Sequence, residues 1–207
     1  MAATVTDLIS STITTLKAAE NHYNDVKDDK DLREAFHEAS RGLLLVRKAL
    51  QTAKTQLGGR NLAGDPKGAM DSLKECNSNA ELSKSIFNAV AQAPETWRFE
   101  RYQEAVRQEG KGRTVEALMM GMMNGVCALA ENDAIKTEME DQVKGLRDAI
   151  EKLSKMEPSV PKEGPDGDTF TNFGSGDMLN APRGTVNKST GSGNHFPGAT
   201  FSGSVTF

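Results

Sequence analysis

The chain has 207 residues, of which 25 are basic and 29 acidic, and its formal net charge is -4. This balance argues against a nucleic-acid-binding protein that works through a basic surface. Cys76 and Cys127 are too few for a disulfide framework or a cysteine zinc site, and both fall on apolar helical patterns, which favours buried free thiols in a reducing compartment. The N-terminus lacks the pattern of a secretory signal, and no apolar stretch reaches the roughly 20 residues of a membrane-spanning helix.

Residues 1–156 show a helical apolar period throughout. The apolar period of the first helix starts from Val5, and Thr4 or Thr6 is expected to be its N-cap. The second follows the apolar residues from Leu32 to Leu57 and stops at a glycine pair. Further helices are expected from Pro66 to before Pro94, with a break near Asn77–Asn79, and at about 97–109, 113–131 and 134–155. Six amphipathic segments with short connections predict an all-α fold, a bundle of about six helices.

The composition changes after Met156. Residues 157–207 hold nine of the 19 glycines and five of the seven prolines, but only eight of the 54 charged side chains. Prolines at 158, 161 and 165 end any helix there. The sequence therefore predicts a helical domain at 1–156, a linker at 157–168 and a separate segment at 169–207.

No catalytic constellation is found in the sequence. Residues 59–64 have the glycine spacing of a phosphate loop, but Asp65 and Pro66 follow in place of Lys and Ser or Thr, which favours a helix connector. The three histidines lack the spacing of a metal site or a catalytic triad. The methionines at 119–123 are interpreted as core rather than as a binding surface. We expect a non-enzymatic protein with no cofactor and no metal.

The C-terminal segment repeats itself. Residues 174–187 and 191–202 share the pattern Gly-Ser-Gly-Asp/Asn, then Leu or Phe, then Pro-x-x-Thr-Val/Phe, and a weaker echo ends the chain. So short a repeat, rich in β-formers and poor in charge, becomes stable by stacking on other copies, whereas the alternative is a flexible Gly/Ser-rich tail. We expect disorder in the monomer and cross-β structure on assembly. The residues assigned to this motif are Phe173, Gly174, Gly176, Leu179, Pro182, Thr185, Val186, Gly191, Gly193, Asn194, Phe196, Pro197, Thr200, Phe201 and Phe207.

Two blocks of the helical part and the tail resemble known families. Residues 8–54, which begin LISSTITTLKAAEN, resemble the opening of the SesA domain of filamentous fungi, and RYQEAVRQEGKGRTVEALMMGMM at 101–123 resembles that family's later block. This resemblance covers about residues 4–150. TGSGNHFPGATFSGSV at 190–205 is similar to the sigma amyloid motif of fungal signalling proteins.

The resemblance implies a prion-like signalling role. In such families the helical domain stands at the N-terminus of NACHT-type receptors or in a separate effector, and the oligomerised receptor templates the effector's amyloid motif. The effector's helical domain then triggers programmed cell death in heterokaryon incompatibility or innate immunity. Because the sequence has no nucleotide-binding module, we expect the downstream effector, cytoplasmic and relocating to the plasma membrane on activation. The implied partners are a NACHT-type receptor with a matching motif, further copies of the chain and membrane lipid, but no nucleic acid.

The first helix is the candidate membrane-active element. Residues 8–16 carry no charge, and each charge moved to the centre of a bilayer costs roughly 2.5–3.5 kcal/mol on insertion scales. One alternative is that its apolar face is simply bundle core. The other, for the whole protein, is an interaction adaptor whose bundle recruits another protein without touching lipid. The apolar face consists of Val5, Leu8, Ile9, Ile13 and Leu16, opposite small hydroxyl residues.

Overall fold

The computed structural model describes residues 4–58 and 66–161 of the chain. The repeat-bearing segment 169–207, with every residue assigned to the assembly motif from Phe173 to Phe207, lies outside these described residues. The helical part forms a compact unit that extends to Pro161.

Six α-helices and two short 3-10 helices make up the described structure, and no strand occurs in residues 4–58 and 66–161. The all-α prediction is therefore confirmed. The α-helices are α1 (Val5–Asn24), α2 (Glu34–Leu57), α3 (Pro66–Ala91), α4 (Arg98–Gln108), α5 (Val115–Ala130) and α6 (Glu140–Ser154), and the 3-10 helices are η1 (Glu95–Trp97) and η2 (Thr137–Met139).

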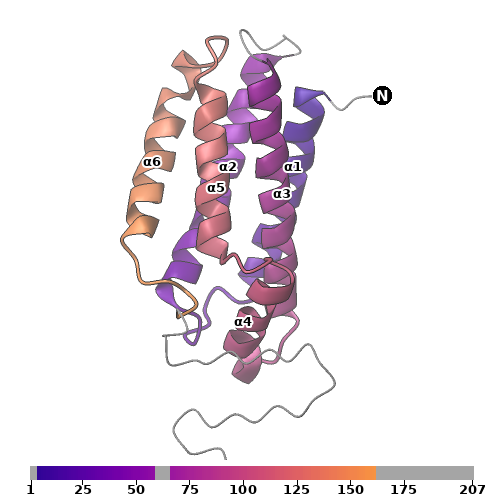
Figure 1. Ribbon diagram of the computed structural model, residues 1–207, viewed down its shortest axis with the longest axis vertical. Helices are drawn as coiled ribbons and strands as arrows, with labels where there is room; N and C mark the ends of the chain where they lie inside the picture. The colour runs from indigo at the N-terminus through magenta and orange to yellow at the C-terminus, as the bar shows by residue number, and fades with distance from the viewer. Residues whose placement is uncertain (1–3, 59–65, 162–207) are drawn as a thin grey trace, which may run out of the picture. The chain divides into compact units, whose positions relative to one another are not determined.

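Four of the helices form the centre of the bundle. α1 packs against α2 and α3, and both of these pack against α5. α6 lies outside α2 and α5, while the short α4 covers one end of the bundle beside α3 (Figure 1). Consecutive long helices run in opposite directions, so the connections between them alternate between the two ends (Figure 1). We call the end that carries α4 the α4 end.

Aromatic side chains fill the core at the α4 end. The ring of Phe36 lies edge-on to Phe87 at a centroid distance of 5.4 Å and to Tyr102 at 4.9 Å, and Tyr23 packs 6.3 Å from Phe36. These four rings come from α1, α2, α3 and α4. Because Phe36, Phe87 and Tyr102 are fully buried, this cluster joins four helices where α4 closes the bundle.

A second part of the core depends on methionine and glycine. Met119, Met122 and Met123 on α5 are fully buried, as the interpretation of this run as core requires. A Cβ atom placed on Gly42 of α2 would lie 2.5 Å from the Met123 methyl carbon, and one on Gly121 would lie 2.7 Å from the Asn79 amide nitrogen. Glycine at these two positions therefore lets α5 approach α2 and α3 closely.

Two expected helix boundaries differ from the structure. α3 is continuous, because Asn77 and Asn79 place their side chains on Thr12 of α1 and Arg113 instead of interrupting the helix. α6 begins at Glu140 rather than near residue 134. The Asn132 carboxamide oxygen accepts the Ala134 amide, which forms a side-chain turn, and a 3-10 helix follows before α6.

The chain does not leave the bundle at the predicted domain boundary, Met156. Ser159 is fully buried, and the Pro158 carbonyl accepts a 3.2 Å hydrogen bond from the Arg33 guanidinium. Val160 packs against the hydrophobic core. We call residues 157–161 the strap. Within the first five residues of the predicted linker, Ser159 and Val160 are thus packed on the helical unit.

Replacement of Phe36 by Ala should lower the free energy of unfolding by about 3–5 kcal/mol, since it removes the ring at the centre of the aromatic cluster and leaves a cavity. The matched control is Leu44→Ala on the same helix, where the side chain is 40% exposed and the expected change is within about 0.5 kcal/mol. Urea unfolding followed by circular dichroism measures both. Similar losses for the two variants would contradict the assignment of this core.

Candidate functional site

The N-terminus of α1 is closed by a reciprocal cap. The Asp7 amide donates to the Thr4 hydroxyl oxygen at 3.1 Å, and the Thr4 amide donates back to the Asp7 carboxylate at 3.0 Å. The Thr4 hydroxyl also donates to the Asp7 carboxylate at 2.7 Å, and this bond, together with the one from the Thr4 amide, holds the pKa of the Asp7 carboxyl below its ordinary value of 3.8. Further along, the Ser10 and Thr14 hydroxyls donate to carbonyls one turn back in their own helix. The first turns of α1 therefore satisfy many of their own polar groups.

All five apolar residues of the candidate membrane face contact the bundle core. Ile9 and Leu16 are fully buried, while Val5, Leu8 and Ile13 are partly buried and pack against the same core. In this conformation the apolar face of α1 packs against the rest of the bundle. Action on a membrane would require the helix to turn or to leave.

Hydroxyl groups fasten α1 to α3. Thr12 donates to the Asn77 carboxamide oxygen at 3.0 Å, and Thr15 donates to the Glu81 carboxylate at 2.6 Å. The sequence interpretation placed both threonines on the face away from the core, but they are buried against α3. The α1–α3 interface is thus partly polar. Water can replace such bonds on separation, which lowers the cost of parting these helices relative to a wholly apolar contact.

A buried carboxylate at the α4 end binds the strap. The Ser159 amide donates to one oxygen of Glu116 at 2.9 Å, and the Ser159 hydroxyl lies 2.6 Å from the other. The Tyr102 hydroxyl lies 2.6 Å from the Ser159 hydroxyl, and the Val115 amide donates to the Tyr102 oxygen at 3.3 Å. Burial, together with the charge of Glu116, raises the pKa of Tyr102, so the phenol stays protonated.

Sequence reasoning missed this group, although one signal was present. Glu116 is the only charged residue between Thr114 and Ala130, within the most apolar helix of the chain. A lone carboxylate in an apolar run needs buried donors. Nothing in the sequence pattern identifies Ser159, 43 positions away, as their source.

A buried ion pair also lies at the α4 end. The Arg98 guanidinium contacts the Asp29 carboxylate at 3.1 Å, and the exposed fraction of the Asp29 side chain is only 2%. The His37 ring approaches the Asp29 carbonyl at 2.8 Å and the Tyr23 hydroxyl at 3.3 Å. These contacts tie the α1–α2 connection to α2 and α4, so they stabilise the α4 end rather than offer free chemistry.

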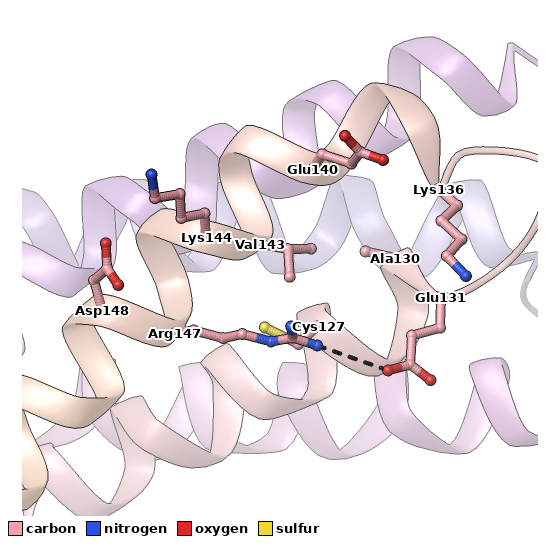
Figure 2. A pocket seen from close by; sticks show the side chains of 9 residues that line it. All are labelled: Cys127, Ala130, Glu131, Lys136, Glu140, Val143, Lys144, Arg147 and Asp148. Carbon is pink, nitrogen blue, oxygen red and sulfur yellow. Dashed lines mark ion pairs between the residues drawn. The ribbon is translucent and has the colours of Figure 1, made fainter.

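An open groove of about 540 Å³ lies between α5 and α6 (Figure 2). Arg147 reaches across it from α6 to Glu131 at the end of α5, at 3.9 Å. Burial raises the pKa of the Cys127 thiol, which therefore remains protonated and a poor nucleophile at neutral pH. The residues lining the groove are Cys127, Ala130, Glu131, Lys136, Glu140, Val143, Lys144, Arg147 and Asp148.

Two further properties concern metals and membranes. Among residues 4–58 and 66–161, no cluster of three or more His, Cys, Asp or Glu side chains could hold a metal ion. Within the same ranges, no helix combines the length and the apolar character needed to cross a bilayer.

Comparisons with protein families identify both parts of the chain. Residues 9–129 match SesA, the N-terminal domain on NACHT NTPases and P-loop NTPases, and residues 167–207 match the sigma domain on NACHT-NTPases. Neither the curated proteins nor the solved structures give a significant match. Both family matches confirm the resemblance drawn from the sequence, and together they support a NACHT-associated signalling role. Because the first match spans more than half of the sequence, the chain belongs to the SesA family.

Proposed function

We propose that this chain is a non-enzymatic signal transducer, a cell-death effector of fungal incompatibility or innate immunity. A NACHT-type receptor with a matching motif would template the sigma segment into a cross-β stack that recruits further copies of the chain. The helical domain would then deliver the output at a membrane. Assembly of the tail would activate the chain, and the conformation of the helical bundle would determine whether it acts on the membrane.

The observation that carries this proposal is the pairing of two modules in one chain. A SesA match at residues 9–129 and a sigma match at 167–207 are both to domains that occur on NACHT proteins, which supports a NACHT-type partner for this chain. The repeat of the Gly-Ser-Gly and Pro-x-x-Thr patterns within the sigma segment supports assembly by stacking.

The contacts of α1 support a role for this helix in the output. Its interface with α3 contains the Thr12–Asn77 and Thr15–Glu81 hydrogen bonds, and residues 8–16 carry no charge. A helix held partly by replaceable polar bonds can leave the bundle, and an uncharged amphipathic helix can then lie in the membrane interface. Release of α1 would therefore expose Leu8, Ile9 and Ile13 to lipid.

An exposed aromatic residue favours a second function, the adaptor. Trp97 is 63% exposed at the junction of α3 and α4, beside a surface pocket that Pro94 and Arg101 help to line. Exposed tryptophans of this kind anchor protein–protein contacts. In this alternative the bundle recruits another protein through the Trp97 surface and never contacts lipid.

Substitution of Thr200 by Pro or of Phe201 by Asp should prevent tail assembly. Proline removes a backbone donor from the ladder, and aspartate places a charge where the stack provides no partner. Full-length protein seeded with fibrils of a 167–207 peptide is examined by fibre diffraction for the ~4.7 Å spacing. Thr169→Asp, outside both repeats, is the control and should assemble normally. Normal assembly of both motif variants would contradict the cross-β proposal.

Replacement of Ile13 by Glu should abolish seeded dye release from phosphatidylcholine–phosphatidylserine vesicles, whereas Ser11→Glu on the exposed face of α1 should retain it. The glutamate at position 13 would enter lipid and the one at position 11 would face water. Because Ile13 also contacts the core, peptides of residues 4–25 with the same changes are tested for vesicle binding. Dye release by the Ile13 variant equal to wild type removes α1 from the mechanism. No release by the wild type favours the adaptor.

The cap of α1 predicts a pH-dependent difference between wild type and Asp7→Asn. A carboxyl with a lowered pKa stabilises the fold above its ordinary value, here 3.8, and this stabilisation is lost as the pH falls through the lowered value. Wild type should therefore unfold at a higher temperature than the variant at about pH 6, and the two should converge near about pH 2. Thermal scans by circular dichroism measure the difference, and a gap that persists at low pH would refute the capping role.

A further inference from the structure

We propose that the strap, residues 157–161, is a latch that holds the bundle in its resting conformation and is pulled away when the tail assembles. The inference rests on the proposed function, because it assigns the step by which assembly of the sigma segment reaches the helical domain. It begins from the contacts of Ser159.

The strap ties together three elements at the α4 end. Ser159 binds Glu116 in the first turn of α5 through both its amide and its hydroxyl, and that hydroxyl also meets Tyr102 of α4. One residue earlier, the Pro158 carbonyl accepts the hydrogen bond from Arg33, the residue just before α2. Ser159 is fully buried, so this attachment excludes water. The strap is therefore a specific attachment and not a loosely packed chain end.

Removal of the strap would take hydrogen-bond donors away from a buried charge. Glu116 is only 7% exposed, and each of its carboxylate oxygens accepts a hydrogen bond from Ser159. A buried carboxylate that loses its donors strongly disfavours the closed bundle. In an open bundle, water can hydrate the carboxylate again. Release of the strap would therefore shift the equilibrium of the bundle towards opening around α4 and α5.

The short connection between the strap and the sigma segment supplies the pulling force. Only residues 162–166 separate Pro161 from the start of the sigma match, and five residues span at most about 17 Å. Stacked strands repeat about every 4.7 Å. If each chain contributes two layers of strands, neighbouring chains in the stack therefore lie only about 10 Å apart. A bundle of helices packed 8–10 Å apart measures roughly 20 Å across, and α2, with 24 residues, is about 36 Å long.

Neighbouring bundles in such a stack would compete for space close to its axis. Detachment of residues 157–161 adds another ~17 Å of chain to each connection, which lets the bundles move outwards. This movement breaks the Ser159–Glu116 hydrogen bonds. A longer connection between strap and sigma segment should relieve the crowding while these bonds stay intact. A lengthened chain therefore distinguishes a latch from a passive anchor.

The test measures hydrogen exchange of the Ser159 amide in the full chain, before and after seeding with 167–207 fibrils. Assembly is monitored in the same samples by the ~4.7 Å reflection. In wild type, exchange should accelerate at least about tenfold on assembly, the equivalent of about one buried hydrogen bond. A chain with about twenty Gly and Ser residues inserted after Lys162 should assemble and keep its protection.

Point variants test the contact at rest. Glu116→Gln and Ser159→Ala should accelerate amide exchange at position 159 by about tenfold before any seeding, because each removes one charged or hydroxyl partner. Ser154→Ala is the control, since its exposed hydroxyl donates to the Glu151 carbonyl within α6, and it should behave as wild type. Unchanged exchange in both the Glu116 and the Ser159 variant would overturn the proposed attachment.

The outcomes separate the two proposals. An assembled wild type that keeps its Ser159 protection, or a lengthened chain that loses it equally, overturns the latch and leaves the proposed function standing. Absence of the ~4.7 Å reflection overturns the proposed function itself, and release of the strap by assembly with it.

Discussion

A carboxylate that is buried away from water needs hydrogen-bond donors. The helical bundle of this chain is arranged around such a carboxylate, Glu116. Glu116 lies in the first turn of α5, where the helix dipole favours negative charge, and each of its oxygens accepts a hydrogen bond from Ser159. To supply these bonds, the chain turns back after α6 and crosses to α4 and α5. Tyr102 connects this group to the aromatic cluster, because its hydroxyl meets Ser159 while its ring packs against Phe36.

The helices were predictable because each carries its apolar residues at a helical period. The six segments and the buried methionines of α5 follow from that pattern. The continuity of α3 through Asn77 and Asn79 was not predictable. Asparagine favours a break in a helix, and here its side chains have partners on Thr12 and Arg113 that the sequence pattern does not show. The late start of α6 depends on a side-chain turn at Asn132, whose local effect outweighs the apolar period.

The candidate site was predictable only in part. The apolar face of α1 follows from spacing, and all five of its residues do pack against the core. The placement of Thr12 and Thr15 against α3 could not be foreseen, because it depends on which polar residues a distant helix presents. The strap is the extreme case. A proline-containing segment beyond the last helix is typical of a linker, and only the three-dimensional position of Glu116 makes Ser159 a buried residue.

Oxidation of the methionines of α5 would mark a bundle that has opened. Met119, Met122 and Met123 are fully buried, so peroxide cannot reach their thioethers at rest. In an opened bundle they would be oxidised to sulfoxides, which are polar and larger. Met123 packs closely on Gly42, where a β-carbon would lie 2.5 Å from the methionine methyl, so a larger and more polar side chain would disturb this contact. Under oxidative conditions, an opened bundle would therefore not close again until the sulfoxides are reduced.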